Sequence, residues 1–438
     1  MASLDKFSRL AALKPTRAFP TRPTELRAPD ENDHLSRILG AGITSNRFGE
    51  HVAVRNWCST PEFTEPSPVA LDLLARHRDE ALSRSTRAAL ANPAKWLFLD
   101  TETTGLAGGT GTYAFLVGLA WWDAGGLQVE QLLMRDFAEE HSVLHELAQR
   151  AAERPVLVTF NGKTFDWPLL ENRFTMTRSI PVPRLAAHLD LLHPARSLWK
   201  LRLGSVRLVD LERHVLDPTR LGWTRDDDIH SSLIPQFYFD YLRGGPASPL
   251  AGVVRHNQMD LRGLAALFCK INTMLSESPE GEGLDLFGLS RYLHRRGEPD
   301  RAHSACAQAL NAGLPAEYRP QARRDLALHA KRRGDYARAA VLWQEIAADP
   351  RDGVHACEQL AIHYERRAKD YLRALEFARL ALGNLRKSRA GLKDPFTQAR
   401  FIRREAKLLK RVVRLQHRIR LSSGAGAQAE FSASLPPI

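Results

Sequence analysis

The order of apolar and polar positions predicts a mixed β-sheet in the first two thirds of the chain. Lys95 to Asp100 and Pro155 to Phe160 are short apolar runs next to Pro or Gly residues that favour turns, and each predicts a strand. Tyr113 to Trp122 and Leu127 to Met134 flank a Gly-containing turn, so they predict an antiparallel hairpin. A hairpin placed between the two other strands in the sequence indicates a mixed sheet.

Apolar residues at helical spacing occupy much of the rest of this region. The pattern predicts helices over 140–152, 165–176, 205–216 and 234–242, and a long helix that begins at His256 and runs through Ile271. Helices interspersed with strands are typical of α/β domains. We therefore predict an α/β domain over residues 95–275, with helices flanking the sheet.

The last third of the chain reads as helical and repetitive. Residues 276–283, Ser-Glu-Ser-Pro-Glu-Gly-Glu-Gly, have the composition of a linker. The sequence Tyr336-Ala337-Arg338-Ala339 recurs as Tyr371-Leu372-Arg373-Ala374, 35 residues later from 336 to 371. This period fits the helix pair of about 34 residues found in tetratricopeptide repeats, which bind partners on a concave face. Over residues 284–385 we predict such an all-α array. It either binds a partner or gives structural support to the preceding domain.

Four other segments complete the predicted organisation. Residues 1–45 and 422–438 have the composition of disordered chain. Residues 46–94 lead into the α/β domain and contain a predicted strand near 51–57 and a helix near 69–90. Residues 386–421 form a basic C-terminal helix whose apolar positions require packing. Its basic face either points to solvent or binds a nucleic-acid backbone.

Acidic residues follow these elements at informative positions. Asp100 and Glu102 are two residues apart on a strand, so both carboxylates leave the same face. Asp166 lies where a strand gives way to a helix, a position at which α/β folds build sites. His256 and Asp260 are four apart and share one helical face. Four carboxylates and a histidine are what a nuclease needs to hold two divalent cations against a phosphodiester.

The donor set indicates the cation and the mechanism. Carboxylate oxygens favour Mg²⁺ or Mn²⁺, and the sequence has no Cys-x-x-Cys or His-Glu-x-x-His pattern that would favour zinc. One ion would activate a water and the other would stabilise the leaving 3′ oxygen. A neutral His256 could take the proton of the attacking water. The backbone of Thr103, Gly105 and Leu106 follows the first acidic pair and is expected to contact a terminal nucleotide.

These motifs resemble the DEDD superfamily of 3′ to 5′ exonucleases on a ribonuclease H-like fold. Within it they are similar to the bacterial YprB-like branch, in which such a domain precedes tetratricopeptide-type repeats. The resemblance covers about residues 95–272 and extends to Leu106-Ala107-Gly108-Gly109-Thr110-Gly111-Thr112-Tyr113 and His188-Leu189-Asp190-Leu191-Leu192-His193. It implies that Asp100, Glu102, Asp166 and Asp260 are metal ligands and that His256 is the general base. Three residues separate His256 from Asp260, the spacing usual for a tyrosine at this position. We also assign Asn161, Phe165 and Asn257 to substrate binding.

Several nearby residues have simpler interpretations. Asp190 is expected to make structural hydrogen bonds, because the site already has its ligands. Residues 225–228, Arg-Asp-Asp-Asp, are expected to form a solvated loop. His188, His193 and His230 are expected to be ordinary polar residues. Gly108-Gly109-Thr110-Gly111 lacks the Gly-Lys-Ser/Thr ending of a phosphate-binding loop and is interpreted as a turn.

Composition agrees with a polyanionic partner. The 438 residues carry a formal net charge of +12, which suits nucleic acid through counterion release. The four cysteines are far apart, and the longest apolar run is too short to cross a bilayer, so we expect a cytoplasmic protein with no membrane partner. The YprB-like resemblance suggests DNA repair, so DNA is the favoured substrate. The first alternative is the same chemistry on RNA. The second is a non-cleaving nucleic-acid-binding scaffold that recruits partners through the repeats.

Overall fold

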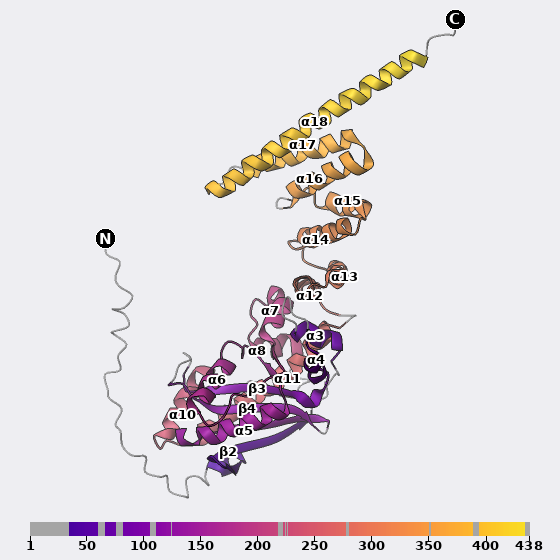
Figure 1. The fold of residues 1–438 in the computed structure, drawn as a ribbon. Helices are drawn as coiled ribbons and strands as arrows, with labels where there is room; N and C mark the ends of the chain where they lie inside the picture. The colour runs from indigo at the N-terminus through magenta and orange to yellow at the C-terminus, as the bar shows by residue number, and fades with distance from the viewer. Residues whose placement is uncertain are drawn as a thin grey trace, which may run out of the picture.

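The computed structural model describes eleven stretches of the chain. They are residues 35–59, 66–75, 82–105, 111–123, 125–217, 222–223, 225, 227–276, 280–349, 352–388 and 394–433. The disorder predicted for 1–45 therefore falls mostly outside the described residues. Figure 1 shows an α/β body at one end of the molecule and a stack of helices that leads away from it. None of the helices in these stretches combines the length and apolar character needed to span a lipid bilayer.

A seven-stranded mixed sheet organises the α/β body. Its order is β1-β2-β5-β4-β3-β6-β7. The strands are β1 Gly42–Asn46, β2 Gly49–Ser59, β3 Trp96–Thr103, β4 Ala114–Asp123, β5 Gly126–Leu133, β6 Val156–Thr159 and β7 Ala187–Asp190. The first five strands in this order pair antiparallel, whereas β3, β6 and β7 are parallel. The predicted hairpin is β4 and β5.

Two strands of the sheet come from segments that the sequence placed outside the domain. β1 overlaps the end of the segment predicted to be disordered, and β2 lies in the lead-in segment. β2 pairs with β5 along its length, from Val52 opposite Leu133 to Ser59 opposite Gly126. The sheet thus begins near residue 42 rather than 95. The strand predicted near 51–57 is confirmed as β2. Its pairing with the distant β5 leaves no local pattern in the sequence, so its place in the domain was missed.

Helices cover both faces of the sheet, and adjacent strand residues pack into different cores. Trp96 and Phe98 point into one core, and Leu97 and Leu99 into the other. The helices are α3 Pro68–Ala75, α4 Arg84–Leu90, α5 Glu140–Glu153, α6 Asp166–Thr177, α7 Leu192–Leu203, α8 Leu208–Leu211, α10 Ile234–Leu242 and α11 Ser248–Met274. The helix predicted over 205–216 is α8 followed by a π-helical turn, Glu212–Leu216. The long helix α11 begins at Ser248, eight residues before the predicted start.

The C-terminal region consists of helices packed in consecutive pairs (Figure 1). They are α12 Gly283–Arg295, α13 Pro299–Asn311, α14 Arg319–Arg332, α15 Tyr336–Glu345, α16 Gly353–His363 and α17 Tyr371–Lys387, followed by α18 Pro395–Ala433. The sequence repeat is also a structural one. Asp335 and Asp370 cap α15 and α17 in the same way, each accepting a backbone N–H three residues ahead at 3.0 Å.

The first helix of this region packs onto the α/β body. Phe287 of α12 is fully buried in the core that also contains Phe98. Asp285 forms a bidentate ion pair with Arg202 of α7, with both distances 2.8 Å. A Cβ on Gly288 would lie 2.4 Å from the Ser197 carbonyl oxygen, so only glycine permits this approach. The linker composition of 276–283 thus correctly indicates a connection, but the domains are not separate there. The linker composition could not show that the next helix, α12, packs onto the α/β body.

The last helix caps the stack. Leu415 and Leu408 of α18 are buried against the preceding helices, and Arg411 and Arg414 share Glu365. Part of the basic character predicted for this helix is therefore used in packing. α18 ends at Ala433 rather than 421.

Candidate active site

The first two carboxylates come from the end of β3. Asp100 lies opposite Gly118 of β4, and Glu102 opposite Leu116, both on the face of the sheet that α11 crosses. A Cβ on Gly118 would come within 2.1 Å of the Asn257 side-chain oxygen. The glycine therefore lets α11 lie close to the strands, as a glycine inside a strand often does.

A buried amide chain holds Asp100 in place. Asn257 donates its side-chain N–H to Asp100 Oδ2 at 2.8 Å, and it accepts from Gln131 at 2.8 Å. Gln131 also donates to the Val254 carbonyl at 2.7 Å. Asn257 is fully buried. The sequence analysis assigned Asn257 to substrate binding. In the structure its side chain instead orients the Asp100 carboxylate, through a contact that only the tertiary fold creates.

Asp166 lies at the start of α6. Its Oδ1 accepts a hydrogen bond from the Thr101 hydroxyl at 2.5 Å, which ties α6 to β3 between the two other acids. Asn161 begins the turn before it, in the left-handed region at φ 68°. Asp190 accepts the backbone N–H of Asn161 at 2.8 Å and of Lys163 at 3.1 Å. The structural role predicted for Asp190 is confirmed.

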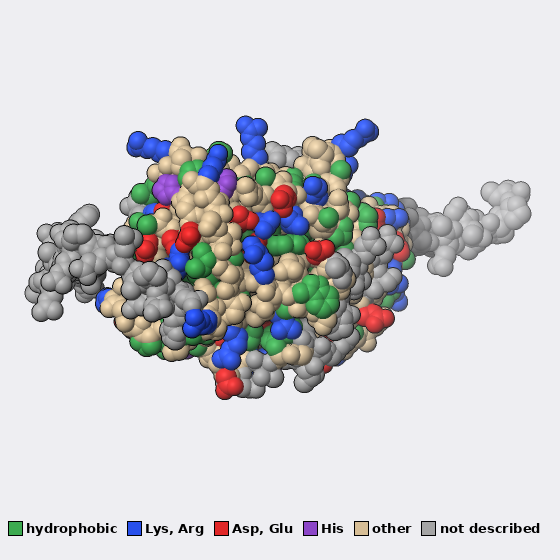
Figure 2. Space-filling view, turned by 90° about the horizontal axis from the view of Figure 1, so that it is seen from below, with side chains coloured by type: hydrophobic (Ala, Val, Ile, Leu, Met, Phe, Trp, Pro, Cys, Tyr) green, Lys and Arg blue, Asp and Glu red, His purple; other side chains and the backbone are tan. Residues whose placement is uncertain are grey.

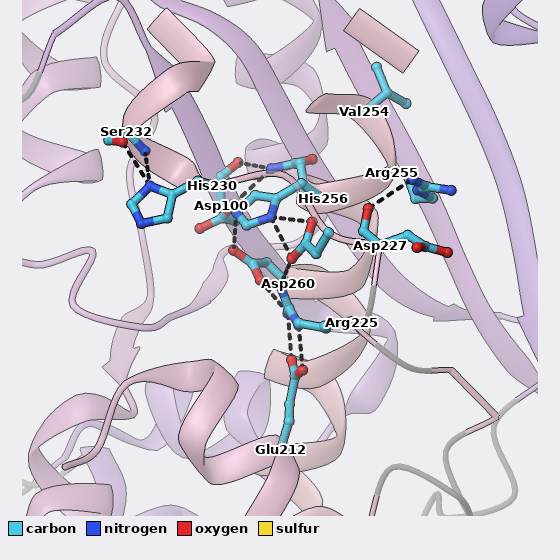
Figure 3. Close-up of polar contacts among 12 residues, drawn as sticks. Asp100, Glu212, Arg225, Asp227, His230, Ser232, Val254, Arg255, His256 and Asp260 are labelled. Carbon is cyan, nitrogen blue, oxygen red and sulfur yellow. Dashed lines mark hydrogen bonds and ion pairs between the residues drawn. The ribbon is translucent and has the colours of Figure 1, made fainter. Parts of the chain in front are cut away.

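The histidine is oriented by an acid that the sequence did not identify as part of the site. His256 Nδ1 lies 2.8 Å from both carboxylate oxygens of Asp228, and its Nε2 lies 3.6 Å from Asp260 Oδ2 (Figure 3). His256 is buried. The expectation that 225–228 is a solvated loop is wrong for Arg225 and Asp228, because both side chains pair with groups of the site.

Arg225 links this acid to the others. Its guanidinium donates to both oxygens of Glu212 at 2.6 Å, to Asp228 at 3.0 Å, and to Asp260 Oδ1 (Figure 3). Burial disfavours the charged form, but these carboxylates outweigh it and raise the pKa of Arg225. Sequence reasoning missed Glu212 and Arg225. Their signal is weak, since acids and arginines on loops are common and only the fold brings them to α11.

The carboxylates repel one another. Burial raises the pKa of Asp100, and the charges of Asp260, Glu102 and Asp166 raise it further. Burial and the charges of Asp260 and Asp166 likewise raise the pKa of Glu102. Burial also raises the pKa of Asp166. A cation among these oxygens would relieve the repulsion.

The donor chemistry therefore fits the divalent cations that the sequence implies, Mg²⁺ or Mn²⁺. As the side chains stand in the described part of the chain, no three acidic, histidine or cysteine residues converge into a ready-made metal site. Arg225 is one reason why the acids do not converge, since its guanidinium pairs with one carboxylate oxygen of Asp260.

The remaining predicted substrate contacts lie beside the acids. Thr103 follows an irregularity in the β3 pairing, and its hydroxyl donates to the Gly105 carbonyl at 3.0 Å. Phe165 precedes Asp166 and is 57% exposed, so its ring is accessible for stacking. Leu106 lies outside the described residues.

Two histidines match their expected ordinary roles. His188 lies 2.9 Å from the Thr159 hydroxyl, and burial lowers its pKa to about 4. His230 accepts the Ser232 backbone N–H at 3.3 Å and caps a short turn.

Comparisons with known proteins find a family, a relative and a solved structure similar to this chain. Residues 97–272 match the RNase H superfamily. The chain is 30% identical to the protein YprB of Bacillus subtilis (strain 168) over 319 residues, which are 72% of this chain and 75% of YprB. A solved family B DNA polymerase from Pyrobaculum calidifontis matches 56% of this chain at 16% identity and a TM-score of 0.31. The match spans 30% of the polymerase's length.

Proposed function

Because this chain belongs to the family of Bacillus subtilis YprB and carries an RNase H superfamily domain, we propose that it is a metal-dependent 3′ to 5′ exonuclease. It hydrolyses phosphodiester bonds, with DNA as the favoured substrate and a role in repair. The observation that carries the proposal is the grouping of Asp100, Glu102, Asp166 and Asp260, from three distant segments, into one set of mutually repelling carboxylates.

In this proposal the four carboxylates hold two divalent cations, Mg²⁺ or Mn²⁺. When bound, such cations activate the attacking water and stabilise the leaving 3′ oxygen. The chain's own residues prepare the site for them. Asn257 orients Asp100, Thr101 orients Asp166, and Arg225 fixes Asp260.

His256 is the proposed general base. The Asp228 carboxylate accepts the Nδ1 hydrogen, so Nε2 is left with its lone pair on the side of Asp260. A proton taken from the attacking water would be held at Nε2. Asp228 stabilises the imidazolium that results, which is the role of the third group in other acid–base arrangements.

Thr103, Gly105, Asn161 and Phe165 lie beside the acids in the proposed substrate path, and Leu106 is assigned to the same path. Their backbone and the Phe165 ring would contact the terminal nucleotide. Selectivity between DNA and RNA depends on contacts to the sugar, so RNA stays the first alternative. The second is a non-cleaving scaffold, with a protein partner on the tetratricopeptide-like repeats. The four cysteines, Cys58, Cys269, Cys306 and Cys357, are thiols, which supports a reducing, cytoplasmic location.

The test is cleavage of oligonucleotides of DNA and RNA, each labelled at either end, with Mg²⁺, Mn²⁺ or a chelator. We expect stepwise shortening from the 3′ end of DNA, dependent on the cation and absent in Asp100→Asn. Shortening of RNA alone would select the first alternative. Binding without cleavage of either polymer, under any cation, would contradict the proposed enzyme and favour the scaffold.

A further inference from the structure

A cavity of about 250 Å³ opens between α12, α13 and α14, and its lining is strongly basic. Four arginines and three histidines line it together with a single acid, Asp325. They are Arg291, Arg295, Arg324, Arg332, His294, His303 and His329. This concentration differs from the end of the molecule away from the repeats, where Lys and Arg are interspersed with Asp and Glu (Figure 2).

A second basic cavity follows one helix pair further along the stack. It has a volume of about 170 Å³ and is lined by Lys331, His363, Arg366 and Arg367, with no acid among its lining residues. The guanidinium of Arg367 lies 4.0 Å above the Tyr336 ring. Lys331 and Arg332 are neighbours on α14 and line different cavities, so the two cavities both border α14.

Several of these charges are not neutralised by the fold. Within the described stretches, Arg291, Arg332 and Arg366 are exposed and have no ion pair with a carboxylate. Arg404 and Arg411 of α18 differ, since Arg404 pairs with Glu358 at 2.8 Å and Arg411 with Glu365 at 2.7 Å. Unneutralised arginines in a concave surface are suited to phosphate oxygens.

The first cavity opens where the stack joins the α/β body. Arg295 donates to the Ser197 hydroxyl of α7 at 2.7 Å, which joins α12 to the α/β body. The next residue, Arg296, is close enough to Lys163 for its charge to affect that amine. Lys163 lies in the turn that leads to Asp166. Lys163, in the turn before Asp166, and Arg296, at the end of α12, thus add positive charge on the two sides of this junction.

We propose that the two cavities, together with Lys163 and Arg296, form a basic track for the phosphate backbone of the strand whose end lies in the active site. This inference rests on the proposed function and assigns the repeats to the substrate rather than to a protein partner. An acidic peptide carries negative charge, as the phosphate backbone does, and is the other candidate ligand for the basic cavities. The charge of Lys163 in the turn before Asp166 favours nucleic acid, because a peptide would have no reason to continue toward the carboxylates.

The test uses the full chain with Asp100→Asn, so that binding is measured without cleavage. Fluorescence anisotropy of a labelled 25-mer of single-stranded DNA is recorded over a range of salt concentrations. The double change Arg291→Ala with Arg332→Ala is compared with Arg379→Ala with Lys387→Ala, which removes equal charge from exposed positions of α17 outside both cavities. We expect the track variant to bind about tenfold more weakly. Its salt slope should fall by about 1.4, because each phosphate that the protein no longer neutralises lowers the slope by about 0.7. The control should retain both values.

Equal affinity and salt slope in the two variants would overturn the track. Labelled poly-glutamate is the second probe. If it binds more tightly than the DNA, and through Arg291 and Arg332, the cavities take acidic peptides and the inference fails. Failure of the proposed function looks different. The enzyme without Asp100→Asn would then leave DNA and RNA intact, while the track variant would still lose DNA affinity.

Discussion

His256 and Asp228 form a hydrogen-bonded pair in which the imidazole Nδ1 is 2.8 Å from each carboxylate oxygen. The pair joins α11 to the loop before α10 and leaves Nε2 directed toward Asp260. A histidine held in this way has one defined tautomer, which is a requirement for a proton acceptor. The pair therefore makes the general-base role testable at two positions.

His256→Ala should lower the single-turnover cleavage rate by about 10² to 10⁴, while cation binding persists because the carboxylates are intact. Asp228→Asn should lower it in the same direction, because the amide no longer stabilises the imidazolium. Single-turnover rates of the wild type and His256→Ala, measured across a range of pH, test whether this residue accepts the proton. His230→Ala is the control, since His230 is exposed and bonds within its own turn. An unchanged pH profile in His256→Ala would remove this residue from proton transfer.

Asp100→Asn should abolish cleavage and yet raise the melting temperature measured without divalent cations. Burial and repulsion raise the pKa of Asp100, so the folded protein binds the proton more tightly than the unfolded chain. Its contribution to stability is present at low pH and is lost as the pH rises through the folded value. Each kcal/mol recovered at neutral pH is worth about 2–4 °C. Calorimetry with and without Mn²⁺ checks this, and a lower melting temperature in the variant would contradict the repulsion.

The protein should lose stability as the pH falls from about 6.5 to about 4, in part through His51. This residue is fully buried beside Ser142, and burial lowers its pKa from 6.5 to about 4. The unfolded chain therefore binds the proton first, so stability is present above pH 6.5 and decreases toward pH 4, by up to about 3 kcal/mol. Urea unfolding at several pH values measures this. His51→Gln should flatten the profile, whereas exposed His193→Gln should not.

Phe287→Ala should destabilise the α/β body by about 3–5 kcal/mol, although residue 287 lies beyond the apparent linker. Its ring fills the core that contains Phe98. Trp343→Ala, at an equally buried position in a separate core of the distal helices, should lower the stability of the stack and spare cleavage. Unfolding followed by cleavage activity and by circular dichroism distinguishes the two. If Phe287→Ala left the cleavage activity as stable as in wild type, α12 would not be part of that core.

Local patterns carried much of this fold, and contacts between distant segments carried the rest. Strand β3 and the shared face of Asp100 and Glu102 follow from the segment 95–102, and Asp166 from a turn before a helix. Asp228 could not be recognised as part of the site, because its role is to pair with His256, which is 28 residues away on another element. For the same reason the sequence misjudged Asn257, which looked accessible but is closed in by Gly118 and Gln131.

The glycine contact between α12 and α7 has a consequence for product length. Because Gly288 lies directly on the carbonyl groups of Ser197 and Leu198, the distance from the basic track to the carboxylates is fixed by the fold. A strand shortened from its end loses the far cavity first and the near cavity next. Digestion should therefore slow at a defined remnant, whose length in nucleotides is a direct measure of that distance.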